Sequence, residues 1–321
     1  MILAETLLDF ISPLFLLSPQ DRWSREQLSG RGFEYFCEGL DETWLRLREP
    51  AAILIDTRDG DGLDRFIASA RRRGIPVISI QDFGLNPLPS DLVIDGSLVP
   101  DFSHPEFPYG ARAFGGPDFM VLDPAFGKLH QKPKQICKTM QSVVINLGGG
   151  DARKFYPRIL GGLKLWAQEV EAVGMRGFVP WGQERLEQRN WHPVRFRWDS
   201  GSADRLLSKA DLAITAGGLS AYEALCAGTP LLALSYDSFQ ATTIRAMAAA
   251  GACIDLGPGD RLDPGRLAGV LSDLACDDSE RRRISRNGRK LVDGRGDERV
   301  SRLIRQTIGE RSGMADREFV E

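Results

Sequence analysis

The stretch ADLAITAGGLSAYEALCAGTPLLALS, residues 210–235, gives the clearest indication of the fold class. It starts as an apolar strand, turns at Gly217-Gly218, continues as a short helix that stops at Gly228, and enters a second apolar strand after Pro230. A strand–helix–strand order of this kind is typical of a parallel βα unit. The glycine turn lies at the carboxyl end of the first strand, where open α/β sheets bind their ligands.

The same alternation of apolar runs and amphipathic segments continues along most of the chain. Uninterrupted apolar strands are what a parallel sheet requires when helices cover both of its faces. The predicted strands are residues 14–17, 51–56, 76–80, 91–94, 143–147, 177–180, 194–197, 212–215, 230–235 and 253–256. The predicted helices are residues 63–73, 156–173, 203–209, 220–227, 239–250 and 264–275, followed by two in the charged segment 277–311. The predicted class is α/β with mostly parallel sheets.

The length of 321 residues predicts two domains, because a domain takes about 150 residues. The alternation breaks between residues 95 and 142, where prolines and glycines are frequent, and this part is expected to connect the domains. A cluster of four lysines (Lys128, Lys132, Lys134 and Lys138) is expected to be a solvated linker. We therefore expect an N-terminal domain over residues 1–138 and a C-terminal domain over 139–321, with C-terminal helices that could cross back.

Composition excludes several classes of function. The formal net charge of −3 offers no basic field for nucleic acid. No uninterrupted apolar run is long enough to span a bilayer, and the N-terminal segment lacks the basic start of a signal peptide. The five cysteines form no CxxC pair and the three histidines have no ligand spacing, so a reduced cytoplasmic protein without metal or cofactor is expected.

A second glycine-rich turn follows the predicted strand 143–147. The sequence VVINLGGGD, residues 143–151, lets the backbone approach a ligand, and the following helix start would favour an anion. Arg153 stands where a dinucleotide fingerprint requires its third glycine, so that motif is absent. A tight turn without a ligand remains the alternative.

Two hypotheses compete for Ser220 and Glu223. The spacing Ser220-x-x-Glu223 matches a capping box, in which both side chains satisfy backbone donors at a helix start. A carboxylate beside a glycine turn could instead accept hydrogen bonds from ribose hydroxyls. The spacing alone leaves both open.

The segment GGLSAYEALCAGTP, residues 217–230, resembles the donor-binding motif of GT-B nucleotide-sugar enzymes such as the MurG glycosyltransferases. It is more similar to the family of SpsG-type spore-coat polysaccharide proteins and PseG-type UDP-sugar hydrolases of pseudaminic-acid biosynthesis. Further segments resemble that family in the same order, over roughly residues 14 to 305: residues 53–57, 77–84, 90–95, 114–126 and 144–151. The resemblance implies a GT-B-like fold of two Rossmann-like domains facing a cleft.

The resemblance also implies a binding site for a UDP-sugar. Its glycine loop on the phosphate side would be Gly148, Gly149 and Gly150, and the backbone at Phe196 would meet the uracil. The diphosphate would lie against Gly217, Gly218, Leu219 and Ser220, with Glu223 on the ribose and Gln240 near the donor or substrate.

The chain departs from the family pattern at the catalytic side. Family members begin with a strand and a Gly-His loop, whereas no Gly-His dipeptide occurs here, so the first βα unit is expected to be missing. Asp123 and Phe239 replace a family Arg and Asn. The catalytic residue is therefore unknown; Asp56, Asp59 and Asp82 at strand ends are candidates, with helix capping or loop hydrogen bonding as the alternative for each.

The resemblance implies a glycosyltransferase or hydrolase that acts at the anomeric carbon of a nucleotide sugar in surface-polysaccharide or nonulosonic-sugar biosynthesis. The alternative is a catalytically inactive homologue that binds a nucleotide sugar or a partner protein. A missing βα unit would leave a sheet edge, which a homodimer or a partner could cover.

Overall fold

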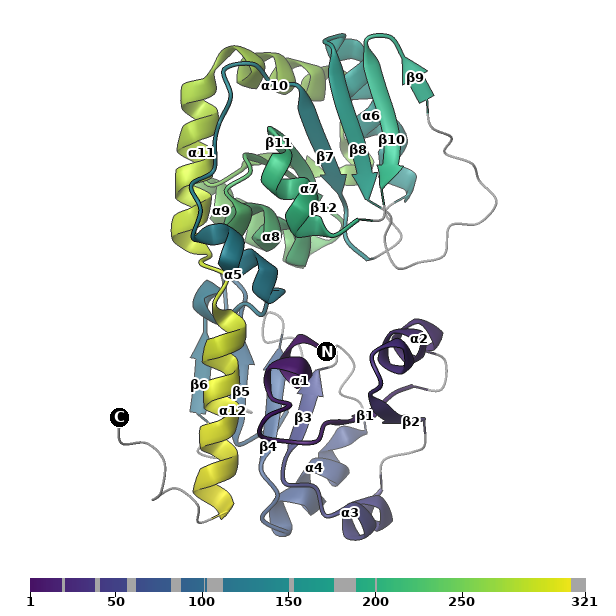
Figure 1. Ribbon diagram of the computed structural model, residues 1–321, viewed down its shortest axis with the longest axis vertical. Helices are drawn as coiled ribbons and strands as arrows, with labels where there is room; N and C mark the ends of the chain where they lie inside the picture. Colours follow the sequence, from purple (N-terminus) through teal and green to yellow (C-terminus); the bar gives the residue numbers. More distant parts are fainter. Residues whose placement is uncertain are drawn as a thin grey trace. The chain divides into compact units, whose positions relative to one another are not determined.

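The computed structural model describes residues 1–18, 21–37, 41–56, 62–81, 88–100, 102, 112–149, 153–175, 189–199 and 201–312 (Figure 1). The chain forms two compact units. Unit 1 contains Met1–Val121 together with Arg295–Glu321, and unit 2 is the continuous segment Leu122–Gly294. The chain therefore leaves unit 1, builds unit 2 and returns to unit 1.

Unit 2 is built on a seven-stranded sheet in the order β13-β12-β11-β7-β8-β10-β9. Among the described strands of this sheet, only β9 and β10 pair antiparallel. The strands are β7 (Ser142–Asn146), β8 (Val170–Met175), β9 (Arg189–Trp191), β10 (Val194–Asp199), β11 (Leu212–Ala216), β12 (Leu231–Ser235) and β13 (Ile254–Pro258). The helices are α5 (Pro124–His130), α6 (Tyr156–Trp166), α7 (Ala203–Lys209), α8 (Leu219–Ala227), α9 (Ser238–Ala249), α10 (Pro264–Cys276) and α11 (Asp278–Leu291), with short 3₁₀ helices at Arg153–Phe155 and Gly259–Arg261.

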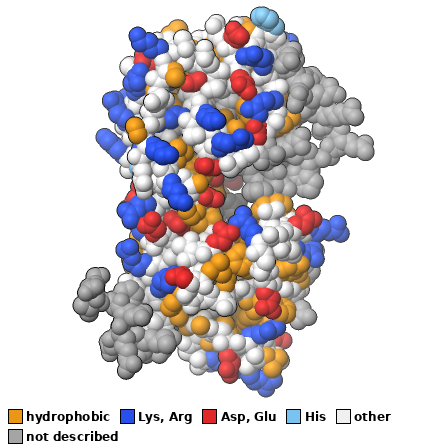
Figure 2. Space-filling model, viewed as in Figure 1, with side chains coloured by type: hydrophobic (Ala, Val, Ile, Leu, Met, Phe, Trp, Pro, Cys, Tyr) orange, Lys and Arg blue, Asp and Glu red, His pale blue; other side chains and the backbone are white. Residues whose placement is uncertain are grey.

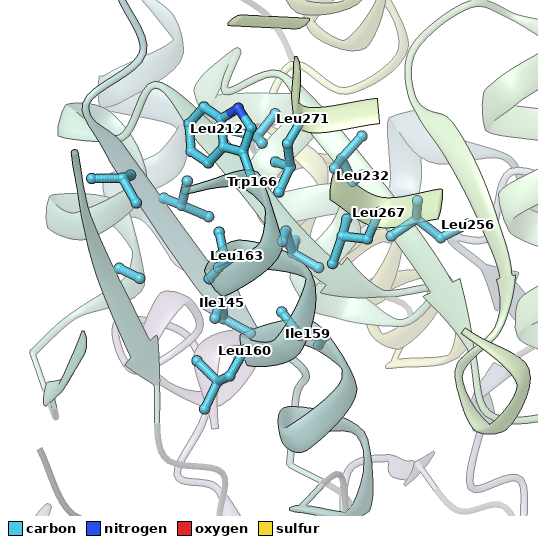
Figure 3. Close-up of a cluster of buried hydrophobic side chains, with 14 of the residues drawn as sticks. Ile145, Ile159, Leu160, Leu163, Trp166, Leu212, Leu232, Leu256, Leu267 and Leu271 are labelled. Carbon is cyan, nitrogen blue, oxygen red and sulfur yellow. The ribbon is translucent and has the colours of Figure 1, made fainter. Parts of the chain in front are cut away.

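Helices α6 and α10 form the core of unit 2 with the sheet (Figure 3). Leu163 of α6, Leu267 of α10 and Ile145 of β7 are fully buried in one cluster. Gly162 lets the two helices approach, since a Cβ at this position would lie 2.6 Å from Leu267 Cδ2. Each such buried aliphatic side chain contributes about 1.5–3 kcal/mol, so this packing holds the sheet that carries the site.

Unit 1 contains a four-stranded parallel sheet in the order β3-β4-β5-β6 and a separate parallel pair, β1-β2. The strands are β1 (Leu14–Leu16), β2 (Glu34–Phe36), β3 (Ile53–Asp56), β4 (Val77–Gln81), β5 (Leu92–Asp95) and β6 (Arg112–Gly115). The helices are α1 (Ile2–Thr6), α2 (Arg22–Gly30), α3 (Glu42–Arg48), α4 (Leu63–Arg72) and α12 (Gly296–Ser312), with a 3₁₀ helix at Pro117–Phe119.

The C-terminal helix α12 is part of the core of unit 1. Its Val300, Ile304 and Ile308 are buried in one cluster with Leu3 and Leu7 near the start of the chain and with residues of β4 and β5. At its first residue, a Cβ on Gly296 would lie 2.1 Å from the carbonyl oxygen of Met120. The two ends of the described chain are thus packed into the same unit.

The division of the chain differs from the boundary expected at residue 138. The segment 122–138 belongs to unit 2, because α5 packs on α7 and α8 and because the Lys134 ammonium donates to the carbonyls of Leu207, Ser208 and Ala210. Of the two C-terminal helices, α11 stays in unit 2 and α12 returns to unit 1.

Two secondary-structure expectations require correction. The helix expected over residues 156–173 ends at Trp166, where Ala167 follows in a left-handed conformation with φ of 54°. Val170–Met175 forms β8 instead. The expected connecting region 95–142 contains β6 and α5. The strand expected at residues 177–180 lies outside the described residues.

Charged side chains of both signs are interspersed on the visible face of unit 2 (Figure 2). On α11, Arg282 pairs with Asp278 at 2.7 Å and Arg283 with Glu280 at 2.6 Å.

Within the described residues, no helix is both long enough and apolar enough to cross a membrane.

Candidate functional site

The turn between β11 and α8 is tightly packed against α9. A Cβ on Gly217 would lie 2.8 Å from Ile244 Cδ1 and 2.9 Å from the backbone oxygen of Gln240. Only a glycine fits this space without moving α9, since real Cβ atoms do not approach that closely. Gly218 follows as the N-cap residue of α8 in extended conformation. The two glycines therefore set where α8 begins.

The start of α8 lacks the capping box that the sequence allowed. The helix begins at Leu219, so Ser220 is its second residue and Glu223 its fifth, and no described side chain caps its N-terminus. Ser220 is 4% exposed, and within the described part of the chain its Oγ has no hydrogen-bond partner. A helix start leaves backbone N–H groups unsatisfied and carries partial positive charge. Backbone and hydroxyl donors of this kind suit an anionic ligand.

The loop after β7 meets this helix start. Strands β7 and β11 are neighbours, with Asn146 opposite Thr215. Gly148 has a φ of 80°, the left-handed region that favours glycine, and a Cβ there would lie 3.7 Å from Ser220 Oγ. The first glycine of the loop thus lies directly beside the Ser220 hydroxyl.

Glu223 lies half-buried below this junction. Its Oε2 accepts a hydrogen bond from Asn146 Nδ2 at 3.4 Å. Burial, followed by the negative charges of Asp123 and Asp204, raises the pKa of Glu223 from 4.5 to about 7. The carboxyl group of Glu223 therefore ionises near neutral pH. In its ionised form both oxygens can accept hydrogen bonds from a ligand.

A third loop, between β12 and α9, completes the cluster. Gln240 Oε1 accepts from the backbone N–H of Tyr236 at 3.1 Å, and Gln240 Nε2 lies 3.8 Å from the Cβ position of Gly218. The Tyr236 hydroxyl donates to the carbonyl of Leu147, and its ring stacks on Phe155 with centroids 5.0 Å apart. The loops after β7, β11 and β12 are thereby tied together at one end of the sheet.

This arrangement can bind an anionic group and hydroxyls side by side. The α8 start, Ser220 Oγ and Gln240 Nε2 are donors, while the Glu223 carboxylate is an acceptor. A phosphate or diphosphate attached to a ribose presents the complementary set. Among the described residues, no group of three His, Cys, Asp or Glu side chains could hold a metal ion.

The remaining predicted site residues lie in several parts of the chain. Phe196 lies within β10, which β8 separates from β7, and its ring is buried in the core. Gly149 follows Gly148 in the β7 loop, and Leu219 is 49% exposed at the first position of α8. Asp56 ends β3 in unit 1. The other three predicted residues (Asp59, Asp82 and Gly150) lie outside the described residues.

Two residues of the cluster, Asn146 and Tyr236, were not expected from the sequence. A polar Asn146 at the end of an otherwise apolar strand, next to three glycines, is the signal that could have indicated the first. Tyr236 carries no such signal, because its role depends on a contact with Leu147, which directly follows β7 and lies 89 residues away in the chain.

Known proteins share this architecture. MurG of Acinetobacter baumannii superposes with a TM-score of 0.68 at 14% identity, covering 95% of this chain and 94% of the other. The Phytolacca americana UGT2 complexed with UDP-2fluoro-glucose and pterostilbene gives 0.63 at 13% identity, covering 95% and 94%. The S. aureus MnaA-UDP structure gives 0.61 at 12% identity, covering 92% and 96%. No protein-family model matches the chain.

The chain is therefore an α/β protein of the GT-B-like fold, with parallel sheets as in MurG and the Phytolacca americana UGT2. At the level of sequence it is a homologue of the spore coat polysaccharide biosynthesis protein SpsG of Bacillus subtilis (strain 168), 29% identical over 219 residues. The matched segment covers 67% of this chain and 64% of SpsG, so it spans less than two thirds of that relative.

Proposed function

We propose that the chain binds a UDP-sugar through unit 2 and acts on its anomeric carbon in the biosynthesis of a spore-coat or related surface polysaccharide. The observation that carries this proposal is the start of α8, where no described side chain caps the helix and Ser220 Oγ, beside Gly148, has no partner among the described residues; Glu223 lies one turn further along. Homology to SpsG supports the polysaccharide pathway, and two proteins of the same fold are described with UDP-2fluoro-glucose and with UDP.

In this proposal each part of the cluster has one task. The α8 start and Ser220 donate to the diphosphate, and the ionised Glu223 accepts from the ribose hydroxyls. Water or an acceptor hydroxyl attacks the anomeric carbon and loses its proton to a base, while the bond from that carbon to the diphosphate oxygen breaks. The departing UDP carries the negative charge, which the donors at α8 stabilise. Asp56, Asp59 and Asp82 remain the candidates for the base.

Calorimetric titration with UDP and with a UDP-N-acetylhexosamine tests the binding part of the proposal. We expect both to bind, and we expect Glu223→Ala to weaken UDP binding by about 10- to 100-fold, the value of a hydrogen bond to a charged group. Uridine without phosphate should bind much more weakly, because it lacks the group that the α8 start would hold. No binding of UDP by the unaltered protein would overturn the assignment of this site.

A second candidate function is binding without turnover, as in a catalytically inactive homologue. The absence of a Gly-His dipeptide from the sequence favours it, since the resembling family carries its catalytic His there. Release of UDP from bound UDP-sugar, followed over time with water alone and with candidate sugar acceptors, separates the two functions. Stable binding with no UDP release under any of these conditions would support the inactive homologue.

A further inference from the structure

Asn146 uses both ends of its side-chain amide within the candidate site. It is the last residue of β7 and is 8% exposed. Its Nδ2 donates to Glu223 Oε2 at 3.4 Å, and its Oδ1 accepts from the backbone N–H of Gly148 at 3.2 Å. One buried side chain therefore joins the glycine loop after β7 to a carboxyl group on α8.

We propose that Asn146 is a positioning residue of the nucleotide-sugar site, which holds the glycine loop in register with Glu223 and favours the ionised carboxylate that a ribose requires. This inference rests on the function proposed above, because it assumes that Glu223 accepts hydrogen bonds from the ligand. Asn146 itself touches neither the ribose nor the reacting atoms; it acts through its two neighbours.

The charges around Glu223 explain why such a donor is needed. Helix α5 presents Asp123 at its N-cap and α7 presents Asp204, and both negative charges disfavour ionisation of Glu223, as does burial. From α11, which also packs on α8, Arg289 donates to the carbonyl of His130. A hydrogen bond donated to a carboxylate favours the charged form, so Asn146 Nδ2 opposes the effects of burial and of the two carboxylates.

Two substitutions at Asn146 distinguish the role of its Nδ2 donor from that of its Oδ1 acceptor. Asn146→Asp keeps an oxygen that can accept from Gly148 but replaces the donor with a carboxylate facing Glu223. Asn146→Ala removes both hydrogen bonds. Asn287→Ala is the matched control, since Asn287 is another asparagine of unit 2 whose Nδ2 donates to a backbone oxygen, that of Gly251.

The first measurement follows the carboxyl group of Glu223 directly, in the protein without ligand. Carbon-13 NMR of labelled glutamate side chains is recorded across a pH series, with Glu223→Gln identifying the signal. We expect the pKa of Glu223 to rise by about 1 in Asn146→Ala and further in Asn146→Asp, because the lost bond is charge-assisted. An unchanged pKa in both variants would overturn the inference, and Asn287→Ala should leave it unchanged.

The second measurement is UDP affinity as a function of pH. At about pH 7 we expect Asn146→Asp to bind UDP about tenfold more weakly than the unaltered protein, with the deficit shrinking toward about pH 9 as Glu223 ionises. An equal loss of affinity at every pH would indicate general damage and would count against the inference. If the unaltered protein fails to bind UDP, the proposed function is wrong, while the NMR titration still decides whether Asn146 controls Glu223.

Discussion

The structure places Ser220 in surroundings that differ from those expected from its sequence. Its spacing to Glu223 allowed a capping box, but the helix begins two residues earlier than that box requires. Ser220 Oγ is buried and has no hydrogen-bond partner among the described residues. A capping role needs Ser at the N-cap position itself, which Gly218 occupies. The sequence could predict a polar residue pair at a helix start, but not which residue would begin the helix.

Replacing Ser220 with Ala should separate stability from ligand binding. Because the Oγ makes no hydrogen bond in the described structure, the free energy of unfolding should change by less than about 0.5 kcal/mol. UDP affinity should fall by about 3- to 10-fold, since one neutral donor to the diphosphate is lost. Calorimetry and urea denaturation measure the two effects.

Ser301→Ala provides the control for that substitution. Ser301 on α12 is equally buried, at 4% exposure, and its Oγ is also unpartnered among the described residues, but it lies in unit 1. It should change neither stability nor UDP affinity appreciably. A loss of affinity in both variants would show that the effect of Ser220 is not local to the site.

The raised pKa of Glu223 predicts a pH-dependent stability. Between pH 4.5 and about 7 the folded protein holds a proton that the unfolded chain has released, so stability falls as pH rises through this window. Glu223→Gln should remove that slope and stabilise the protein at pH 8 by at most about 3 kcal/mol, following 1.36 kcal/mol per pKa unit. Urea denaturation at a series of pH values measures it, and parallel curves for the two proteins would contradict the expected burial cost.

At the scale of elements, the alternation of strands and helices was readable from the sequence because buried parallel strands are continuously apolar. The exception at residues 156–173 has a physical cause. Val170–Met175 is a short apolar run directly after a helix, and its pairing with β7 and β10, rather than any local period, makes it a strand. Tyr236 was missed for the same reason, since a contact between distant segments defines its role.

The junction between the β11 turn and α9 should tolerate no side chain at Gly217. In Gly217→Ala the new methyl group would meet Ile244 and the backbone of Gln240 below 3.0 Å, so α9 must shift. We expect a loss of about 1–3 kcal/mol in stability together with weaker UDP binding, because Gln240 moves away from Gly218. Thermal unfolding and calorimetry on the same samples provide the measurement.

Gly269→Ala is the matched change in the same unit. Gly269 lies inside α10 with no atom within 4 Å of its Cβ position, so alanine there should stabilise the protein by about 0.5–1 kcal/mol. We expect the two substitutions to change the free energy of unfolding in opposite directions. A stable Gly217→Ala protein with full UDP affinity would show that the turn has more room than its packing indicates.

At the scale of the whole molecule, the two-unit organisation was predictable from length, whereas the boundary and the path of the chain were not. The lysine cluster suggested a linker because charged residues are usually solvated. One of those lysines, Lys134, is instead largely buried and donates to three carbonyls at the end of α7, which lowers its pKa to about 8 through burial. Helix α12 returns to unit 1 because its apolar residues Val300, Ile304 and Ile308 are buried in the core of that unit.

The core position of α12 predicts a local effect of Ile304→Ala. Removing this buried side chain, which packs with Leu7 and with β4 and β5, should destabilise unit 1 by about 2–5 kcal/mol. Hydrogen exchange read by mass spectrometry should therefore speed up in β4 and β5, and less so in β7 and β11 of unit 2. Uniformly faster exchange in both units would show that they unfold as one cooperative body.

The return of α12 to unit 1 also has a consequence for how the protein is made. On the ribosome, residues 122–294 emerge as an uninterrupted segment, whereas the nascent first unit waits for a helix encoded after them. At roughly 5–20 residues per second, that wait is on the order of 10–35 s. During it, the surfaces of β4 and β5 that α12 will cover remain open to chaperones, and unit 2 can complete its folding first.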